Sequence, residues 1–192
     1  GLTSITIGNS VKEIGKSAFY GCTGLTSINI PDSVTEIDDY AFIGCTGLTS
    51  ITIGNGVKEI GEGAFQACTR LKEVTIPDDS ITGINGYTFA YCTSLTSITI
   101  PNGVRGICEN AFKDCSKLKR LYIPMSLKKM HRCTFGNTHE EVKTSHPFSN
   151  DFSCSTVKII KTEPIKNYEF NPETNQLTIG KDIENKTITD IV

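Results

Sequence analysis

The sequence predicts a leucine-rich repeat solenoid, a right-handed curved superhelix of mostly β structure with short helical or 3₁₀ turns and a parallel concave sheet. One observation is an apolar unit that recurs six times, with leading leucines 23 residues apart except for one step of 24. The other is a phenylalanine late in each unit, followed three residues later by cysteine in all copies but the last. The leading leucines are Leu2, Leu25, Leu48, Leu71, Leu95 and Leu118.

The first part of each unit predicts a short strand. In the second copy, Leu25 is followed by Ile28 and Ile30, with polar residues between the isoleucines. This alternation is the pattern of a strand with one buried face. Pro31 lacks the N–H that a sheet ladder needs, so we expect the strand to end there.

The second part of each unit predicts a return path to the next strand. Val34 and Ile37 begin a second short apolar segment, and Ala41 with Phe42 suits a short helical or 3₁₀ turn. Gly44 gives the backbone freedom to turn back. One coil cannot bury its own apolar edge, so we expect neighbouring coils to share one core.

The repeat divides the chain into three expected parts. Residues 1–138 form an array of six coils, 139–162 an insertion and a degenerate seventh coil, and 163–192 a hairpin segment and the possible start of a further repeat. Cys154 stands 39 residues after Cys115, and this alignment places Ile160 beside Leu121 in a seventh strand. Turn residues at 171–175 separate two alternating segments and predict the hairpin. Because Gly1 begins directly on a repeat strand, we expect a fragment of a longer chain.

The composition argues against several classes of function. A net charge of −2 lacks the basic footprint of a nucleic-acid-binding domain. No apolar run reaches the roughly 18 residues that a membrane span needs. His131, Cys133, His139 and His146 lack a zinc-ligand spacing, so we expect no metal and no cofactor. With most cysteines explained by the repeat, we predict that the chain is not an enzyme.

The eight cysteines fall into two groups. Five keep the register of the repeat and predict a ladder of buried thiols that act as small hydrophobic groups. Cys108 and Cys133 lie in adjacent predicted coils at positions offset by two, and they are the candidate disulfide. Cys154 also departs from the register, and the sequence leaves open whether any of these three is bridged.

The candidate binding surface is the outward face of the predicted concave sheet. Residues that flank the second apolar position of each strand point away from the core. They are small and hydroxylated in the first half of the array, and become charged and aromatic toward Arg120 and Tyr122. Tyrosine is enriched where binding energy concentrates, although solvated strand residues have the same pattern. The candidate protein-binding residues are Glu73, Thr75, Ser97, Thr99, Lys119, Arg120 and Tyr122.

The unit L-x-x-I-x-I-P-x-x-V-x-x-I-G-x-x-A-F-x-x-C resembles the BspA-like leucine-rich repeat family over residues 1–138. The copy that begins at Leu48 matches it at Ile51, Val57, Phe65 and Cys68, among other positions. The resemblance implies surface-exposed or secreted proteins of host-associated bacteria that adhere to host matrix proteins and to other cells. It brings no catalytic residues.

We therefore expect a non-catalytic adhesion or protein-interaction module at the cell surface or secreted. Its expected partner is a protein of the host extracellular matrix or of another cell surface. One alternative is a structural spacer that holds another domain away from the envelope. Another is a carbohydrate-binding module, with polysaccharide as partner. Self-association through an exposed sheet edge at Gly1 is a further open alternative.

Overall fold

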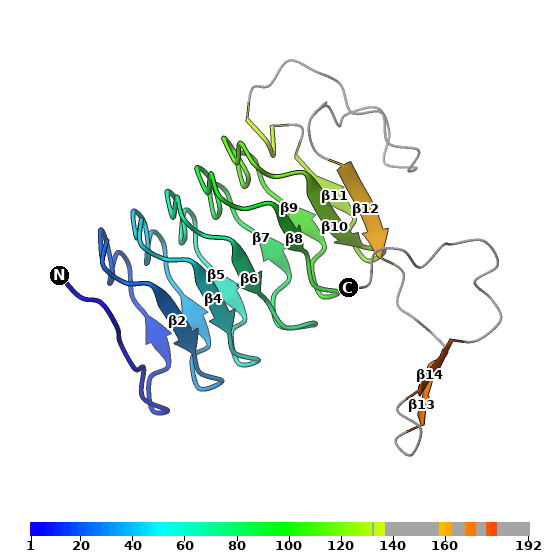
Figure 1. The fold of residues 1–192 in the computed structure, drawn as a ribbon, viewed down its shortest axis with the longest axis horizontal. Coiled ribbons are helices and arrows are strands. Elements are labelled where there is room, and N and C mark those ends of the chain that lie inside the picture. Colours follow the sequence, from blue (N-terminus) through cyan, green and yellow to red (C-terminus); the bar gives the residue numbers. More distant parts are fainter. Residues whose placement is uncertain (132, 137–157, 163–167, 172–175, 180–192) are drawn as a thin grey trace. The chain divides into compact units, whose positions relative to one another are not determined.

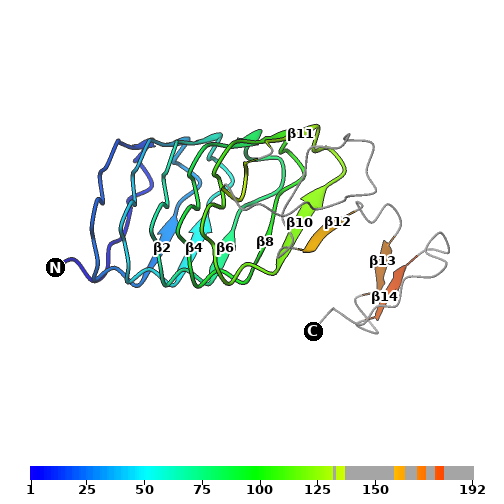
Figure 2. The same cartoon turned by 90° about the horizontal axis from the view of Figure 1, so that it is seen from above.

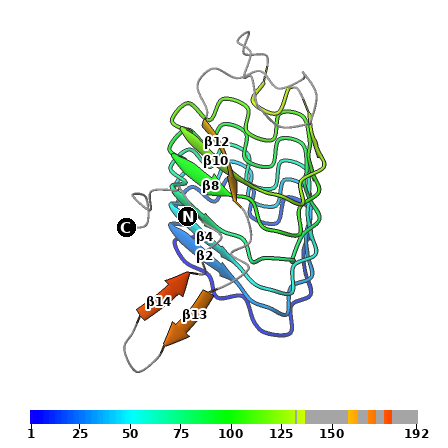
Figure 3. The same cartoon turned by 90° about the vertical axis from the view of Figure 1, so that its right-hand side faces the viewer.

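The computed structural model describes residues 1–131, 133–136, 158–162, 168–171 and 176–179. The chain divides into two compact units, Gly1–Thr162 and Glu163–Val192. In the first unit successive coils stack on one another, and corresponding strands lie side by side (Figures 1 and 3). All strand pairs in this unit are parallel, which confirms the predicted parallel solenoid.

The first strand of each coil lies on one side of the stack, which we call the strand face (Figure 2). Side chains alternate there as predicted: in β2, Ser27 and Asn29 are exposed, whereas Ile28 and Ile30 are buried. The strands form two three-stranded sheets, one after the other along the stack. The first holds β2 (Ser27–Ile30), β4 (Ser50–Ile53) and β6 (Glu73–Thr75), and the second β8 (Ser97–Thr99), β10 (Arg120–Pro124) and β12 (Lys158–Thr162).

A two-residue strand follows in each coil and builds the second side of the stack, which we call the return face. It is divided in the same way into two three-stranded parallel sheets. The first holds β1 (Glu13–Ile14), β3 (Glu36–Ile37) and β5 (Glu59–Ile60), and the second β7 (Gly83–Ile84), β9 (Gly106–Ile107) and β11 (Lys129–Met130).

The seventh strand is present, but its predicted register is wrong by one residue. In β12, Ile159 is the partner of Leu121, and Ile160 is the partner of Tyr122. The sequence alignment rests on Cys154 and Val157, which lie outside the described residues. A shift of one residue exchanges the two faces of a strand, so apolar residues at both 159 and 160 leave the register poorly specified by pattern alone.

In the second unit, β13 (Tyr168–Asn171) and β14 (Gln176–Ile179) pair antiparallel, with Tyr168 opposite Ile179. These strands occupy the two segments where the sequence predicts a hairpin. The turn expected between them lies outside the described residues.

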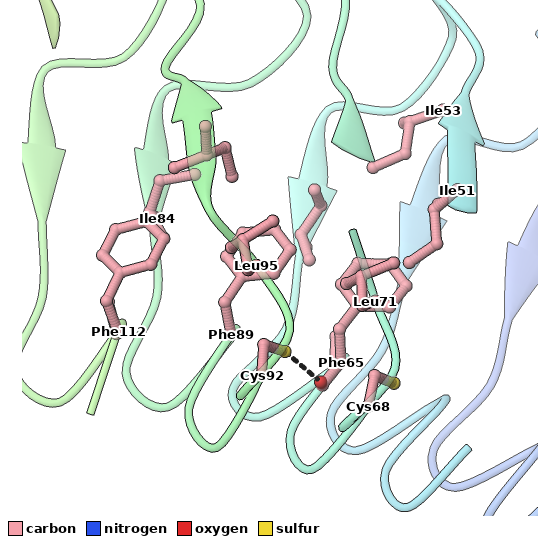
Figure 4. Close-up of a cluster of buried hydrophobic side chains, with 14 of the residues drawn as sticks. Ile51, Ile53, Phe65, Cys68, Leu71, Ile84, Phe89, Cys92, Leu95 and Phe112 are labelled. Atoms are coloured by element: carbon pink, nitrogen blue, oxygen red, sulfur yellow. Dashed lines mark hydrogen bonds between the residues drawn. The ribbon is translucent and has the colours of Figure 1, made fainter. Parts of the chain in front are cut away.

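The core of the first unit is a set of parallel rows of identical or similar side chains. Leu25, Leu48 and Leu71 are fully buried in one row. The phenylalanines form a second row in which ring planes are nearly parallel from Phe19 to Phe112, with centroids 5.6 Å apart between Phe65 and Phe89 (Figure 4). Each coil therefore buries its apolar edge only because its neighbours supply the same surface, as the repeat predicts.

The predicted helical or 3₁₀ turns are wrong, because the described residues contain no helix. In the segment that leads to Phe42, successive backbone N–H groups donate alternately to the next coil and to a carbonyl of their own coil. The Tyr40 and Phe42 N–H groups donate to carbonyls of the next coil, Glu62 O and Ala64 O, at 2.8 and 2.7 Å. The N–H of Ala41 donates locally, to Asp38 O. Since every second donor leaves the coil, no helical ladder can form.

Left-handed backbone conformations recur in these turns. Tyr40 has φ of 57° and Gly63, its counterpart in the next coil, has φ of 59°. A Cβ at Gly63 would lie 2.6 Å from the Tyr40 ring, so glycine here both accepts the backbone conformation and makes room for the tyrosine.

The stack has a discontinuity where the repeat step is 24 residues. The strand face is not hydrogen-bonded between β6 and β8, and the return face is not hydrogen-bonded between β5 and β7, within the described part of the chain. The extra residue lies in the turn between β6 and β7. The sheet strands before this turn therefore pair only with one another, and the strands after it form separate sheets.

The third side of the stack is continuous across this point. Phe65 and Phe89 stack with centroids 5.6 Å apart, and the Phe65 N–H donates to Thr88 O at 3.0 Å. The phenylalanine row therefore joins the two halves that the sheets leave separate.

A search of the described residues for helices long and apolar enough to span a membrane found none.

Candidate functional site

The strand face brings four of the predicted binding residues into one cluster. Arg120 of β10 lies beside Ser97 of β8, and Tyr122 lies beside Thr99. Ser97, Thr99 and Arg120 are exposed, whereas Tyr122 is half-buried. Neighbouring strands of a sheet lie about 4.7–4.9 Å apart, so one partner can contact all four side chains.

The remaining predicted residues lie around this cluster. Lys119 is exposed at the start of β10, and its N–H donates to Thr96 O at 2.9 Å. Glu73 and Thr75 are exposed on β6, but β6 pairs with β4 and not with β8. The structure therefore places Glu73 and Thr75 on the other side of the discontinuity from Arg120.

Charge is divided along the array at the same point. Residues 1–80 contain five Lys or Arg and ten Asp or Glu, whereas residues 81–136 contain eight and two. The strand-face residues follow this division, since Glu73 lies before the extra residue and Arg120 after it. The net charge of the chain is therefore near zero although residues 1–80 are acidic and residues 81–136 are basic.

Four of the five register cysteines, Cys45, Cys68, Cys92 and Cys115, form the predicted ladder of buried thiols, whereas Cys22 is half-buried. Each of these four Sγ atoms donates to the carbonyl of the phenylalanine one coil earlier. Cys68 donates to Phe42 O at 3.3 Å, and Cys92 donates to Phe65 O at 3.3 Å (Figure 4). Burial raises the pKa of the Cys45 thiol to about 11 and that of Cys115 to about 12. These thiols therefore remain protonated at neutral pH and serve packing.

Cys108 and Cys133 lie in adjacent coils as free thiols, the first exposed and the second half-buried. The neighbouring backbone is joined by a hydrogen bond from the Asn110 N–H to Cys133 O at 2.8 Å. A disulfide between these two residues stays a prediction. Among the described residues no group of three or more His, Cys, Asp or Glu side chains is placed to hold a metal ion.

A cleft of about 410 Å³ opens where the turns of the second to fifth coils meet the return face. We call it the Gly86 cleft, because the absence of a side chain at Gly86 leaves it open. Its wall includes Asp39 and Glu62 from the acidic half and Glu109 from the basic half, with Asn85 and Tyr87 between them.

One edge of this cleft already holds a cationic side chain of the chain itself. The Lys16 ammonium lies 3.7 Å from Asp39 Oδ2 and 5.9 Å from the centre of the Tyr40 ring. The Tyr40 hydroxyl donates to Glu62 Oε1 at 2.9 Å, and this hydrogen bond raises the pKa of Tyr40. Carboxylates and tyrosine rings on this edge therefore form niches for a cation.

Our sequence reasoning missed the cleft because it considered only outward strand residues. The signal is present at the position three residues before each phenylalanine, where Asp39, Glu62 and Glu109 are acidic and Gly86 interrupts the series. Only the stacked structure shows that the glycine within this series of acidic residues leaves the Gly86 cleft open.

Comparison with family models gives a match to the BspA type leucine rich repeat region, in six copies, over residues 1–119 and 78–181. The comparison with curated proteins gave no match.

Several solved structures of bacterial proteins are similar. A leucine-rich repeat protein from Bacteroides ovatus shares 33% identity, with a TM-score of 0.68, over 84% of this chain and 43% of that protein. The leucine rich repeat protein of T. pallidum shares 32%, with a TM-score of 0.57, over 69% and 65%. A leucine rich cell surface protein from Faecalibacterium prausnitzii shares 25%, with a TM-score of 0.54, over 81% and 52%. The present chain thus spans less than two thirds of each of these proteins, and it belongs to the BspA-type leucine-rich repeat family.

Proposed function

We infer that this chain is a non-catalytic adhesion module of a bacterial cell surface or of a secreted protein, and that it binds a protein partner through the strand face. The observation that carries the proposal is the placement of Arg120 and Tyr122 beside Ser97 and Thr99 on paired strands. An arginine and a tyrosine within an exposed, hydroxyl-rich sheet are the residue types that dominate protein interfaces.

The family and one solved neighbour support a location at the cell surface. Leucine-rich arrays display surfaces for binding, and the F. prausnitzii neighbour is described as a cell surface protein. Lys119 and Arg120 favour a partner with acidic groups at the contact, such as a matrix protein of the host. Glu73 and Thr75 widen the proposed surface across the discontinuity.

The test is a pull-down with a panel of purified extracellular-matrix proteins. A triple variant, Glu73→Ala, Arg120→Ala and Tyr122→Ala, is compared with a control that removes the same residue types away from the strand face, Glu13→Ala, Arg105→Ala and Tyr20→Ala. All of the control residues are exposed.

We expect the strand-face variant to lose at least tenfold in affinity for the captured partner, and the control to change less than twofold. Full affinity in the strand-face variant would contradict the proposal, and capture of no protein of the panel by the parent chain would favour a spacer. Retention of a purified polysaccharide, in place of every protein of the panel, would favour the carbohydrate-binding alternative.

A further inference from the structure

We propose that the Gly86 cleft binds an arginine side chain presented by a partner protein, on a part of the surface separate from the strand face. The cleft is a space between coils whose walls are built from four turns. Its chemistry is that of a guanidinium receptor, with carboxylates at both ends and a tyrosine between them.

The carboxylates of the cleft can accept further hydrogen bonds from a ligand. Glu62 and Glu109 are both exposed, and neither forms an ion pair within the described part of the chain. Glu62 Oε1 accepts from the Tyr40 hydroxyl, which holds this side chain in place. A planar guanidinium carries five donors and can bridge two carboxylates, which a compact ammonium does less well.

The tyrosine of the cleft is fixed in position. Its hydroxyl accepts a hydrogen bond from Asn110 Nδ2 at 3.0 Å, so Tyr87 extends toward the following coil. Asn85 is fixed as well, since its amide donates to Ile60 O at 2.8 Å. The walls of the cleft are thus set before a ligand arrives, which lowers the cost of binding.

A lysine of the chain shows how a cation is held in this setting. Lys16 approaches both the carboxylate of Asp39 and the ring of Tyr40, one coil apart. Lys16, Asp39, Glu62, Gly86 and Glu109 occupy the same position of successive coils. At Gly86 no side chain of the chain fills this position, and the adjacent Tyr87 corresponds to Tyr40. The cleft is therefore the space that the absent side chain leaves between Glu62 and Glu109 of the neighbouring coils, with Tyr87 beside it.

The glycine itself offers a sharp test. A Cβ at Gly86 would lie 3.4 Å from Glu109 O and 3.9 Å from Glu62 Cγ, which is ordinary contact. A lysine can therefore be introduced at this position without moving the backbone. In Gly86→Lys the new ammonium is expected to lie between the two glutamates, as Lys16 lies beside Asp39, and to exclude an external cation.

The experiment is an amide NMR titration of the full chain at low ionic strength with N-acetyl-arginine amide as probe. N-acetyl-citrulline amide, which has nearly the same shape and no charge, is the control ligand. Two doubly neutralised variants are compared, Glu62→Gln with Glu109→Gln, and Glu13→Gln with Glu36→Gln on the return face.

We expect saturable shifts of the Gly86 and Tyr87 amides with the arginine amide alone. The dissociation constant should rise at least fivefold in the cleft variant and change less than twofold in the return-face variant, and Gly86→Lys should abolish the shifts. The proposal is overturned by equal shifts with citrulline, by equal weakening in both double variants, or by the absence of saturable shifts. Because no strand-face residue is changed, these results are independent of adhesion through Arg120 and Tyr122.

Discussion

The side-chain amide of Asn85 donates to the backbone carbonyl of Ile60 at 2.8 Å, in the place where other coils use a backbone N–H. The equivalent acceptors Ile37 O and Ile84 O receive the N–H groups of Gly61 and Cys108 at 2.7 and 2.9 Å. Asn85 thus bridges the two return-face sheets at the discontinuity, where the extra residue has separated β5 from β7.

Replacing Asn85 with alanine should therefore weaken this junction. The change removes the donor to Ile60 O, and a lost hydrogen bond of this kind costs about 1–2 kcal/mol. The measurement is the free energy of unfolding in urea. Asn29→Ala on the exposed side of β2 is the control, and we expect it to stay within about 0.5 kcal/mol of the parent chain. Equal effects of the two substitutions would contradict the bridging role.

Deleting Asp79 should close the discontinuity. The turn then reads Pro77-Asp78-Ser80-Ile81, which matches Pro31-Asp32-Ser33-Val34 of a regular coil. Asp78 already makes the regular contact, since its Oδ1 accepts the N–H of Asn102 as Asp32 accepts that of Asn55. Rejoined ladders of a few hydrogen bonds are expected to raise the free energy of unfolding by about 1–3 kcal/mol.

The control for this deletion is the removal of Ser33, which shortens a regular coil and should destabilise the chain. If deletion of Asp79 left stability unchanged or lowered it, the extra residue would not be the cause of the divided sheets.

Neutralising Glu36 should stabilise the chain at neutral pH. Glu36 lies between Glu13 and Glu59 on paired strands. Loss of solvation and the neighbouring carboxylates raise its pKa above 4.5. The folded state therefore binds the proton more tightly than the unfolded state, and the charged ladder destabilises the fold as pH rises through the raised pKa.

Urea unfolding from pH 3.5 to pH 7 measures this effect. Glu36→Gln should match the parent chain at the acid end and exceed it at pH 7. Glu73→Gln removes an equal charge beside Ser50, and it should show no such widening with pH. A constant difference between Glu36→Gln and the parent chain across the pH range would contradict the ladder explanation.

The cysteines should differ sharply in reactivity. Cys108 is exposed, whereas Cys92 is buried, and burial raises its pKa well above the ordinary value. Alkylation requires access and a thiolate, so Cys108 is expected to react in the native protein and Cys92 only on unfolding. Peptide mapping after brief iodoacetamide treatment at pH 8 gives both rates. Comparable rates would contradict the buried ladder, and resistance of both Cys108 and Cys133 until reduction would establish their predicted disulfide.

Much of the fold could be predicted because each coil repeats one apolar pattern. The leucine, phenylalanine and cysteine rows follow from spacing alone, and Leu48, Phe65 and Cys68 are buried as expected. The helical turns could not be predicted correctly, since the alternation of Tyr40 and Ala41 donors depends on carbonyls that only the next coil supplies.

Less of the candidate site than of the fold could be predicted from the sequence. Pattern placed Arg120, Tyr122, Ser97 and Thr99 on one face, and their pairing follows from the 23-residue step. The separation of Glu73 from this cluster could not be foreseen, because a repeat step of 24 residues does not by itself show that the sheets are divided there. The Gly86 cleft depends on a missing side chain between stacked turns, which has no signature within one repeat.

The most direct test of strand-face binding is hydroxyl-radical footprinting of the complex with the matrix protein captured in the pull-down. Tyr122 lies on the strand face, whereas Tyr20 is 70% exposed in a turn away from it. We expect oxidation of Tyr122 to fall at least threefold on complex formation while that of Tyr20 stays constant. Protection of Tyr20 with unchanged oxidation of Tyr122 would contradict the account.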